Sequence, residues 1–220
     1  MTPAVEAIDL FRFFHAGDEE TIALRGISLS VDAGEMVAVT GPSGSGKSTL
    51  LACLAGLDEP DGGMVRVAGH PLSRRPEAQR SRLRAQHIGM LFQSGNLLEH
   101  LTVEQNVALA QRLSRRVDNA RRASVLEDLG LAARAGAYPS QLSGGEAARA
   151  GLAVAIANEP SVLLADEPTG EVDAAAEANV LALLRRSAQA GGAVVVVTHS
   201  GTVAAAADRV IMLIDGEVTH

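Results

Sequence analysis

The stretch Gly41-Pro42-Ser43-Gly44-Ser45-Gly46-Lys47-Ser48-Thr49 decides the fold of this chain of 220 residues. Its spacing fits the pattern G-x-x-x-x-G-K-[S/T], whose glycines allow successive backbone N–H groups to point inward at an anion. An apolar run from Met36 to Thr40 precedes it, and a helix is expected from the end of the loop to about Leu54. A strand, a glycine-rich loop and a helix in this order predict a phosphate-binding loop, because a helix N-terminus favours anions.

Two side chains of this loop extend the prediction from phosphate to a magnesium-bound nucleotide. Lys47 is the only lysine of the chain, beside eighteen arginines, and its ammonium group suits the β- and γ-phosphates. The hydroxyl of Ser48 suits Mg²⁺. The alternative, an ordinary glycine-rich turn before a helix, requires neither of these side chains.

The composition indicates a folded α/β domain. Hydrophobic residues make up 47% of the chain and charged residues 20%, which argues against disorder. The net charge of −7 gives no general attraction to nucleic acid. Cys53 is the single cysteine, so no internal disulfide is possible and a reducing compartment is indicated. No apolar run of the sequence approaches the roughly 20 residues that cross a bilayer.

Short apolar runs alternate with helical patterns along the rest of the chain. Strands are expected at five further runs: Ile27 to Val31, Met64 to Ala68, Val162 to Ala165, Ala193 to Val197 and Ile211 to Ile214. Thr102 and Gln105 form a capping-box pattern before a helix, and further helices are expected over Val117 to Leu129 and from about Ala174 to Ala188. This alternation indicates a parallel sheet. The middle of the chain, from about Ser73 to Leu142, reads as an inserted helical subdomain.

The strand that begins at Val162 ends in two carboxylates, Asp166 and Glu167. Beside a phosphate loop, Asp166 is expected to hold Mg²⁺ through water, and Glu167 to polarise an attacking water. A pair of acids after a strand is often only a turn. The preceding phosphate loop and the following Pro168-Thr169-Gly170 favour the chemical roles.

Two further segments have ordinary structural explanations when each is considered alone. Leu142-Ser143-Gly144-Gly145-Glu146 precedes a helix expected from about Ala147 to Ala157, and Ser143 is explained as its N-cap. His199 follows the strand that ends at Val197, where a core histidine is the commoner case. The order of all the motifs changes both interpretations.

Six motifs, taken in order, resemble the nucleotide-binding subunits of ABC transporters. They are GPSGSGKST, Gln93 in MLFQSGNLL, LSGGE, VLLADEPTG, Asp173 in GEVDAAA and His199 in VVVVTHS. The resemblance covers essentially the whole chain and implies a single ABC ATPase domain. That domain is expected to have a RecA-like P-loop NTPase core with an N-terminal antiparallel β-subdomain, about residues 1–90 and 160–220. An α-helical subdomain is expected at about residues 91–159.

The resemblance implies that two such domains stack head to tail. Ser143, Gly144 and Gly145 of one subunit then clamp the ATP that the phosphate loop of the other subunit binds. A helix N-terminus suits this task because its N–H groups are a preorganised anion site. The implied partners are a second copy, or a second nucleotide-binding subunit, and a transmembrane permease subunit. The domain is therefore expected to be cytoplasmic, on the inner face of the cell membrane, with no nucleic acid partner.

The resemblance also assigns roles to isolated side chains. Gln93 is expected to sense Mg²⁺ and the attacking water, His199 to contact the γ-phosphate, and Asp173 to couple the two sites of the dimer. The expected catalytic and metal-binding residues are therefore Lys47, Ser48, Gln93, Asp166, Glu167 and His199.

An aromatic residue near the start of the chain is expected to stack on adenine. Phe14 matches the family position, with Phe13 as an alternative, and a strand residue packed in the core is a second explanation. Stacking of this kind is worth roughly 1–3 kcal/mol per base in single-strand binders.

Some residues depart from the family pattern. After the signature, Glu146, Ala147 and Ala148 replace the usual glutamines and arginine-rich start of a helix, and Val154 stands where arginine is common. The loop after Thr169 reads Gly-Glu-Val-Asp, where asparagine and leucine are more usual. None of these changes removes an expected catalytic group. They do affect how strongly the signature segment is expected to clamp ATP and how fast ATP is expected to be hydrolysed.

Several functional readings compete. The chain looks most like the lipoprotein-releasing and macrolide-export branch, which includes division-associated complexes that transmit force without transport. A soluble ABC ATPase that acts on DNA or ribosomes would need long coiled coils or a second cassette, and a regulatory module that holds ATP without turnover would not need Glu167.

Two stretches are rich in arginine, residues 74–84 and 112–122. They are interpreted as solvated helix faces, with contact to a partner or to lipid headgroups as the alternative.

Overall fold

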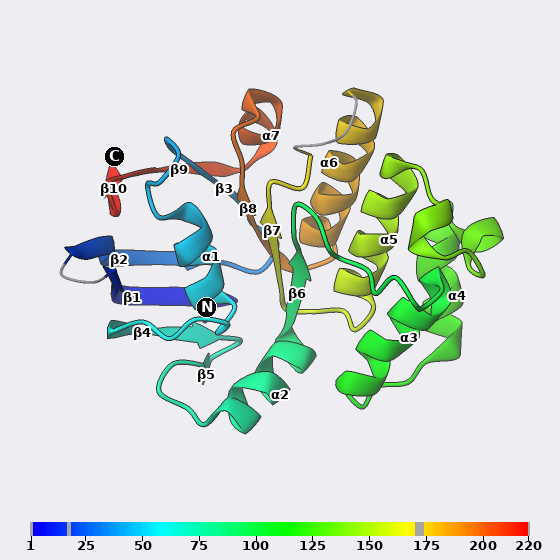
Figure 1. Ribbon diagram of the computed structural model, residues 1–220, viewed down its shortest axis with the longest axis horizontal. Coiled ribbons are helices and arrows are strands. Elements are labelled where there is room, and N and C mark those ends of the chain that lie inside the picture. Colours follow the sequence, from blue (N-terminus) through cyan, green and yellow to red (C-terminus); the bar gives the residue numbers. More distant parts are fainter. Residues whose placement is uncertain (1, 17–18, 170–173, 220) are drawn as a thin grey trace.

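The computed structural model describes residues 2–16, 19–169 and 174–219 and contains two β-sheets with helices packed on them (Figure 1). The first sheet is antiparallel and has the order β2-β1-β4-β5. Its strands are β1 (Val5–Ala16), β2 (Glu19–Val31), β4 (Gly62–Val67) and β5 (His70–Pro71).

The second sheet has six strands in the order β10-β9-β3-β8-β7-β6. Its neighbouring strands are parallel, except that β10 runs antiparallel to β9. The strands are β3 (Met36–Thr40), β6 (Ile88–Leu91), β7 (Val162–Asp166), β8 (Ala193–Val197), β9 (Arg209–Ile214) and β10 (Glu217–Thr219). The parallel sheet that the alternation predicts is thus confirmed.

The helices divide between the two sides of the six-stranded sheet. Helix α1 (Lys47–Leu54) packs against strands of both sheets, whereas α5 packs against β6, α3, α4 and α6. Figure 1 shows α3, α4 and α5 together on the side away from the antiparallel sheet. The other helices are α2 (Glu77–His87), α3 (Val103–Leu113), α4 (Asn119–Asp128), α5 (Gly144–Ile156), α6 (Ala174–Gln189) and α7 (Gly201–Ala206), with short 3₁₀ turns at Ala132–Arg134 and Pro139–Gln141.

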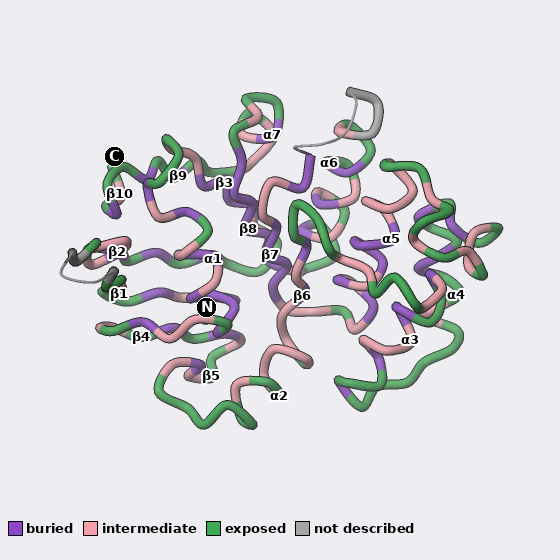
Figure 2. Tube along the Cα trace, viewed as in Figure 1, coloured by how far each residue is buried: buried purple, intermediate pink, exposed green. Residues whose placement is uncertain are grey.

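Both faces of the six-stranded sheet are buried, as the purple segments in its centre show (Figure 2). Every residue of β8 is buried. Val195 and Val197 join the core shared with α1 and the antiparallel sheet, while Val194 and Val196 join the core beneath the outer helices. Successive side chains of a strand point to opposite faces, so a strand buried on both sides reads as a continuous apolar run.

Some element boundaries differ from those predicted. Helix α4 begins at Asn119, two residues after the expected Val117, because the Asp118 side chain accepts a hydrogen bond from the Arg121 N–H (2.8 Å) and caps the helix. Helix α5 begins at Gly144, before the expected Ala147. The middle section expected to be helical also contains β6, whose four residues pair in parallel with β7.

Across residues 2–16, 19–169 and 174–219, the structure has no helix that is both long enough and apolar enough to span a bilayer.

Candidate nucleotide site

The predicted functional segments emerge from one edge of the six-stranded sheet. Val197 of β8 pairs with Val39 of β3 on one side and with Asp166 of β7 on the other. On the outer strand, Leu91 of β6 pairs with Ala165 of β7. The carboxyl ends of four neighbouring parallel strands therefore lie at nearly the same level, which is where open α/β sheets bind ligands.

Three glycines shape the loop between β3 and α1. All three have positive φ angles, of 145° at Gly41, 79° at Gly44 and 99° at Gly46. A Cβ atom on Gly41 would lie 2.0 Å from the carbonyl oxygen of Leu213, and one on Gly46 would lie 2.3 Å from that of Ala23. Gly41 and Gly46 are thus required for packing, whereas Gly44 faces open space with nothing within 4 Å of its would-be Cβ.

Lys47 lies against the loop that precedes it. Its Nζ donates hydrogen bonds to the carbonyl oxygens of Gly41 (2.9 Å) and Pro42 (2.8 Å), and its side chain is largely buried. The loop therefore keeps its shape around the ammonium group. The remaining loop residues differ in exposure: Ser45 is buried, Thr49 is half-buried, and Pro42, Ser43, Gly44 and Ser48 are exposed.

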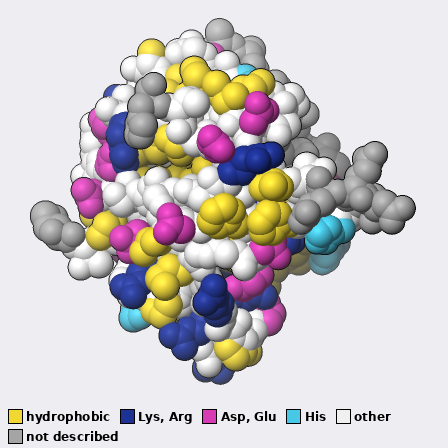
Figure 3. All heavy atoms as spheres, turned by 90° about the vertical axis from the view of Figure 1, so that its left-hand side faces the viewer, with side chains coloured by type: hydrophobic (Ala, Val, Ile, Leu, Met, Phe, Trp, Pro, Cys, Tyr) yellow, Lys and Arg dark blue, Asp and Glu magenta, His cyan; other side chains and the backbone are white. Residues whose placement is uncertain are grey.

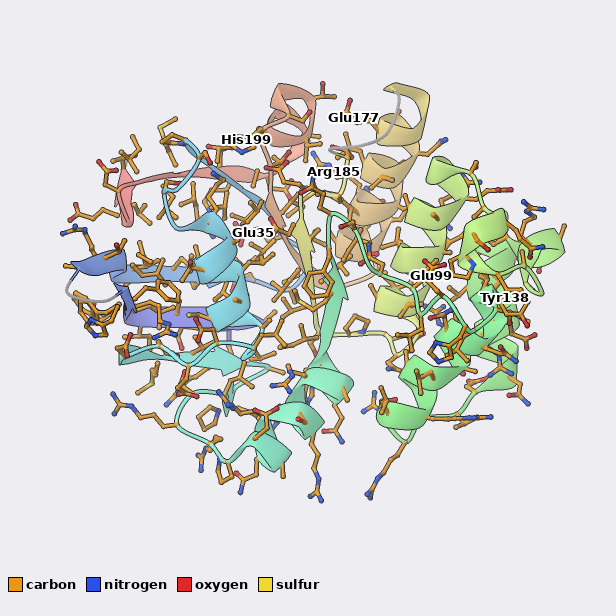
Figure 4. The ribbon with its side chains drawn as sticks, in the orientation of Figure 1. Glu35, Glu99, Tyr138, Glu177, Arg185 and His199 are labelled. Carbon is orange, nitrogen blue, oxygen red and sulfur yellow. The ribbon has the colours of Figure 1, made fainter. Side chains whose placement is uncertain are left out.

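Glu167 and His199 face each other across the strand ends (His199 is labelled in Figure 4). The Glu167 Oε2 accepts a hydrogen bond from the His199 backbone N–H (3.2 Å), and the imidazole Nε2 lies 3.3 Å from Oε1. Oε1 is buried and makes no hydrogen bond within the part of the chain that the structure describes. A carboxylate oxygen in this state retains lone pairs that can still accept a hydrogen bond.

The backbone at Glu167 is strained, with a φ of 46°. Its N–H donates to the carbonyl of Val197 (2.9 Å), which fixes the turn at the end of β7. A left-handed conformation costs on the order of 1 kcal/mol or more at a residue other than glycine. The turn holds this carboxylate beside His199.

A link between α6 and α7 supports the position of His199. Ser200 caps α7, with its Oγ accepting from the Val203 N–H (3.3 Å), and the same hydroxyl donates to Oε1 of Glu177 on α6 (2.6 Å). Figure 4 labels Glu177 and His199 at the same end of the molecule. Ser200 ends the motif VVVVTHS, but the sequence motifs assign no role to it or to Glu177.

Gln93 follows β6 and lines a cavity of about 250 Å³ together with Glu167. Gly144 and Ala147 at the start of α5 line the same cavity. The predicted glutamine, the predicted base and the signature segment of one chain therefore meet around one hollow. A larger cavity of about 910 Å³ lies elsewhere, and none of the predicted site residues lines it.

The signature segment forms a complete capping box at the start of α5. Ser143 Oγ accepts from the Glu146 N–H (3.2 Å), and Glu146 Oε2 accepts from the Ser143 N–H (2.8 Å). Arg134 pairs with the same carboxylate through Nε and Oε1 (3.0 Å) and also donates to the carbonyl of Gln141 (2.7 Å). The hydrogen bond from Ser143 and the Arg134 guanidinium hold the pKa of Glu146 below its ordinary value.

This capping box explains why Gly144 and Gly145 belong to the first turn of the helix instead of the loop before it. The S-x-x-E spacing of Ser143 and Glu146 is itself a signal for such a start, so the boundary was within reach of the sequence. Arg134 gave no such signal, because nothing in its local pattern relates it to Glu146 twelve residues later.

The structure separates the two candidates for the adenine contact. Phe13 stacks on Phe11, with ring centroids 6.4 Å apart, whereas Phe14 is 43% exposed. One face of Phe14 is covered by the Arg12 guanidinium at 4.6 Å from the ring centroid. Phe14 pairs with Thr21 of β2, two residues from Ala23, the residue that packs on Gly46. Phe14 therefore remains the better candidate, and its role stays a prediction.

Asp166 ends β7 beside Glu167 and is half-buried. With the Ser48 hydroxyl and the Gln93 amide oxygen, it provides hard oxygen donors of the kind that Mg²⁺ prefers. The predicted Asp173 lies outside the described residues.

Comparisons with known proteins agree with this geometry. The family model described as ABC transporter matches residues 24–170. The macrolide export ATP-binding/permease protein MacB of Shigella flexneri is 46% identical over 223 residues, and that of Escherichia coli strain K12 is 45% identical. Each alignment covers all of this chain but only 34% of the relative. The chain thus spans about a third of the length of the curated relatives that it matches.

Solved structures give the same result for the fold. The dimeric structure of MJ0796, a bacterial ABC transporter cassette, has a TM-score of 0.89 at 34% identity and covers 98% of this chain and 97% of its own. A post-hydrolysis state of the same cassette, bound to ADP and Pi, also has a TM-score of 0.89, at 35% identity, with the same coverage. A nucleotide-free cassette from an ABC transporter, 19% identical with a TM-score of 0.82, matches in fold.

Proposed function

This chain belongs to the ABC transporter family as an ATP-binding and ATP-hydrolysing cassette, and we propose that it drives a membrane complex of the macrolide-export type. In this proposal it works as a head-to-tail dimer and couples ATP hydrolysis to a transmembrane permease. It then acts at the inner face of the cell membrane, where that partner holds it. The relatives of the chain support the proposal, because they are named for export and one of the similar cassettes was solved as a dimer.

The proposal assigns a function to each subdomain of the chain. The RecA-like core and the β-subdomain, about residues 1–90 and 160–220, bind the nucleotide. The helical subdomain, about residues 91–159, presents the signature segment to the partner subunit's nucleotide. Both assignments rest on the site residues, because the phosphate loop follows β3 and Ser143 caps α5.

The phosphates of ATP are proposed to bind the loop from Gly41 to Thr49. The exposed residues Ser43 and Gly44 and the N-terminus of α1 offer N–H groups. Lys47 would exchange one or both of its carbonyl partners, Gly41 and Pro42, for phosphate oxygens. Because these partners are neutral, a phosphate competes well for the ammonium group.

The magnesium ion of the nucleotide is proposed to bind Ser48, with Asp166 and Gln93 near it. Their hydroxyl, carboxylate and amide oxygens suit this ion. When bound, Mg²⁺ neutralises charge on the phosphate oxygens.

Glu167 is proposed as the general base that accepts a proton from the attacking water. The carboxylate is held by the backbone N–H of His199, while the buried Oε1 has no hydrogen-bond partner among the described residues. His199 then stands between this carboxylate and the position of the γ-phosphate, and Gln93 lines the same cavity as Glu167. This placement of Glu167 at the same edge of the six-stranded sheet as the phosphate loop is the observation that carries the proposal.

The direct test replaces Glu167 by glutamine. Glutamine keeps the size and one oxygen but cannot accept the proton, and a general base contributes typically ~10²–10⁴-fold to rate. Phosphate release in E167Q should fall by about that factor, while a fluorescent ATP analogue should bind as in the wild type. Light scattering should show a dimer that forms with ATP and persists, because the nucleotide at its interface is not hydrolysed.

Glu35 offers a matched control. Its side chain is 22% exposed, compared with 18% for Glu167, and it pairs with Arg209 (2.9 Å) next to the opposite end of β3. E35Q should therefore lose an ion pair of comparable burial and keep its ATPase activity. Full activity in E167Q, or an equal loss in E35Q, would contradict the assignment of the base.

A further inference from the structure

The C-terminal end of α3 and the loop that joins it to α4 have an inverted polarity. Gln111, at the end of α3, and Ser114, in the loop, are buried, while Leu113 is 68% exposed and Val117 is 62% exposed. These are the two most exposed large hydrophobic side chains among the described residues. We refer to residues 112–117 as the basic loop, because Arg112, Arg115 and Arg116 complete it.

Hydrogen bonds to Gln111 maintain this arrangement. The Ser114 Oγ donates to the Gln111 carbonyl (2.9 Å), and the Gln111 Nε2 donates to the carbonyl of Asp118 (2.9 Å). Arg122 donates to the Gln111 Oε1 (3.0 Å). Because the polar side chains are satisfied inside, the outward position of Leu113 is built into the loop and does not result from loose packing.

The three arginines of the basic loop are exposed, and none forms an ion pair within the described part of the chain. The acidic side chains near the loop are engaged elsewhere. Glu104 pairs with Arg122 (3.2 Å), Glu159 lies 3.5 Å from Arg121, and the Asp118 carboxylate caps α4. The loop thus carries uncompensated positive charge although the chain as a whole has a net charge of −7.

A second group of arginines lies on and just before α2, which is close to the end of α3. The Asn158 side-chain amide donates to the carbonyl of Ala85 in α2 (3.5 Å) and to that of Ala110 in α3 (3.0 Å), so it bridges the two helices. Arg80 and Arg84 pair with acids, whereas Arg74, Arg75 and Arg82 are exposed without a pair among the described residues. Figure 3 shows cationic side chains gathered at the lower end of the molecule, where Figure 1 places α2.

We propose that the basic loop contacts the surface of an anionic phospholipid bilayer directly, with Leu113 and Val117 entering the headgroup region. The arginines would bind lipid phosphates, and those near α2 would add to the attraction. Exposed aliphatic side chains between arginines suit the boundary between headgroups and acyl chains, where apolar burial and attraction to anionic lipid act together. This contact goes beyond coupling through a transmembrane partner, because it needs no second protein.

A bilayer fits this surface better than an acidic protein does. No residue of the basic loop lines either of the two cavities described above. Of the three residue types that most often anchor protein interfaces, the loop has arginine but neither tyrosine nor tryptophan. Two projecting aliphatic side chains need only a soft apolar layer to enter.

The chain contains no tryptophan, so L113W provides a single fluorescent reporter in the basic loop. The full chain is mixed with vesicles of phosphatidylcholine containing phosphatidylglycerol, with no transporter present. Tryptophan emission should shift to the blue and be quenched by brominated acyl chains, and raised salt should weaken the binding. Vesicles of phosphatidylcholine alone should bind weakly.

Three double variants separate charge from insertion in vesicle flotation. R115Q/R116Q should weaken binding by about fivefold for each arginine removed, and L113S/V117S should weaken it by about tenfold or more. R25Q/R66Q removes the same charge from exposed positions of the antiparallel sheet and should bind like the wild type. Unchanged thermal melting and ATPase activity in each variant would show that the fold is intact.

Several outcomes would overturn the proposal. One is that the wild type does not bind anionic vesicles at low salt. Another is that R25Q/R66Q weakens vesicle binding as much as R115Q/R116Q does, which would show that net charge alone drives the binding. Binding without a blue shift and without loss in L113S/V117S would exclude insertion. None of these outcomes depends on the ATPase assignment, because the vesicle assay requires neither nucleotide nor a partner.

Discussion

At the scale of single residues, Cys53 reports on the core that supports the phosphate loop. It lies in α1, immediately after that loop, and is 1% exposed. Burial raises the pKa of its thiol to about 12, and only the thiolate reacts with disulfide reagents and maleimides. A single buried thiol therefore measures opening of the structure around α1.

We expect the native protein to react with a thiol reagent at pH 8 very slowly, and the urea-unfolded protein to react at once. Saturating ATP should slow the native reaction further, because ligand binding to the folded state suppresses opening. Mass spectrometry after timed labelling measures both rates. Rapid native labelling that ATP leaves unchanged would contradict the burial of Cys53 beneath the loop.

The sequence was most informative where a residue serves chemistry at a fixed spacing. The phosphate loop, Glu167 and His199 belong to such motifs, and the structure brings them to one edge of the sheet. Arg134 and Glu177 contribute through contacts with residues distant in sequence, Glu146 and Ser200 respectively. Only the fold reveals such contacts, because no local pattern connects the two partners.

At the scale of elements, the start of α5 depends on one carboxylate. Glu146 accepts from the Ser143 N–H and pairs with Arg134, and its pKa is lowered by both, the Ser143 bond first. A carboxylate whose pKa is lower in the folded state stabilises the fold above its ordinary value near 4.5. That contribution is lost as pH falls from this value through the lowered folded pKa.

E146Q should therefore be less stable than the wild type at pH 7, and the difference should shrink as pH falls below about 4.5. Glutamine retains an oxygen for the Ser143 N–H but loses the charge that Arg134 binds. Urea unfolding at several pH values measures the difference in free energy of unfolding. A pH-independent difference would indicate that packing, and not the ionised carboxylate, accounts for the effect.

The elements whose bounds the sequence does not set lack the periodic signal that reveals the others. Helix α2 has no buried residue, so it carries no apolar stripe. Strand β6 has four residues, which is too short for a pattern of its own. Strand β1 contains register shifts against β2, one of them between Arg12 and Phe13, and these interrupt its alternation. In contrast, β8 is buried along its whole length, so its sequence is a continuous apolar run.

At the scale of the whole molecule, the phosphate loop and the signature segment of one chain do not meet at a common site. The phosphate loop and Glu167 lie at the edge of the six-stranded sheet, whereas Ser143 caps α5 among the helices. Within one chain, the start of α5 meets Gln93 and Glu167 around the 250 Å³ cavity, and no residue from Gly41 to Thr49 lines it. The proposed head-to-tail dimer would resolve this separation, because each phosphate loop would then face the partner's signature.

Mixing two inactive variants tests this composite site. Ser143→Arg removes the signature contact and keeps the phosphate loop, while Lys47→Ala does the reverse. Alone, Ser143→Arg should bind ATP normally and Lys47→Ala should bind it weakly. Neither variant alone should hydrolyse much ATP. In a mixed head-to-tail dimer, the intact loop of the first variant meets the intact signature of the second, so one of the two sites is complete. With random pairing, half of the dimers are mixed, and activity should recover to about a quarter of the wild-type rate.

Ser143→Ala mixed with Lys47→Ala is the milder control for any effect of the arginine on the start of α5. If crosslinking detects mixed dimers but phosphate release stays at the level of the separate variants, each chain must hydrolyse ATP with its own residues, and the shared site would be wrong.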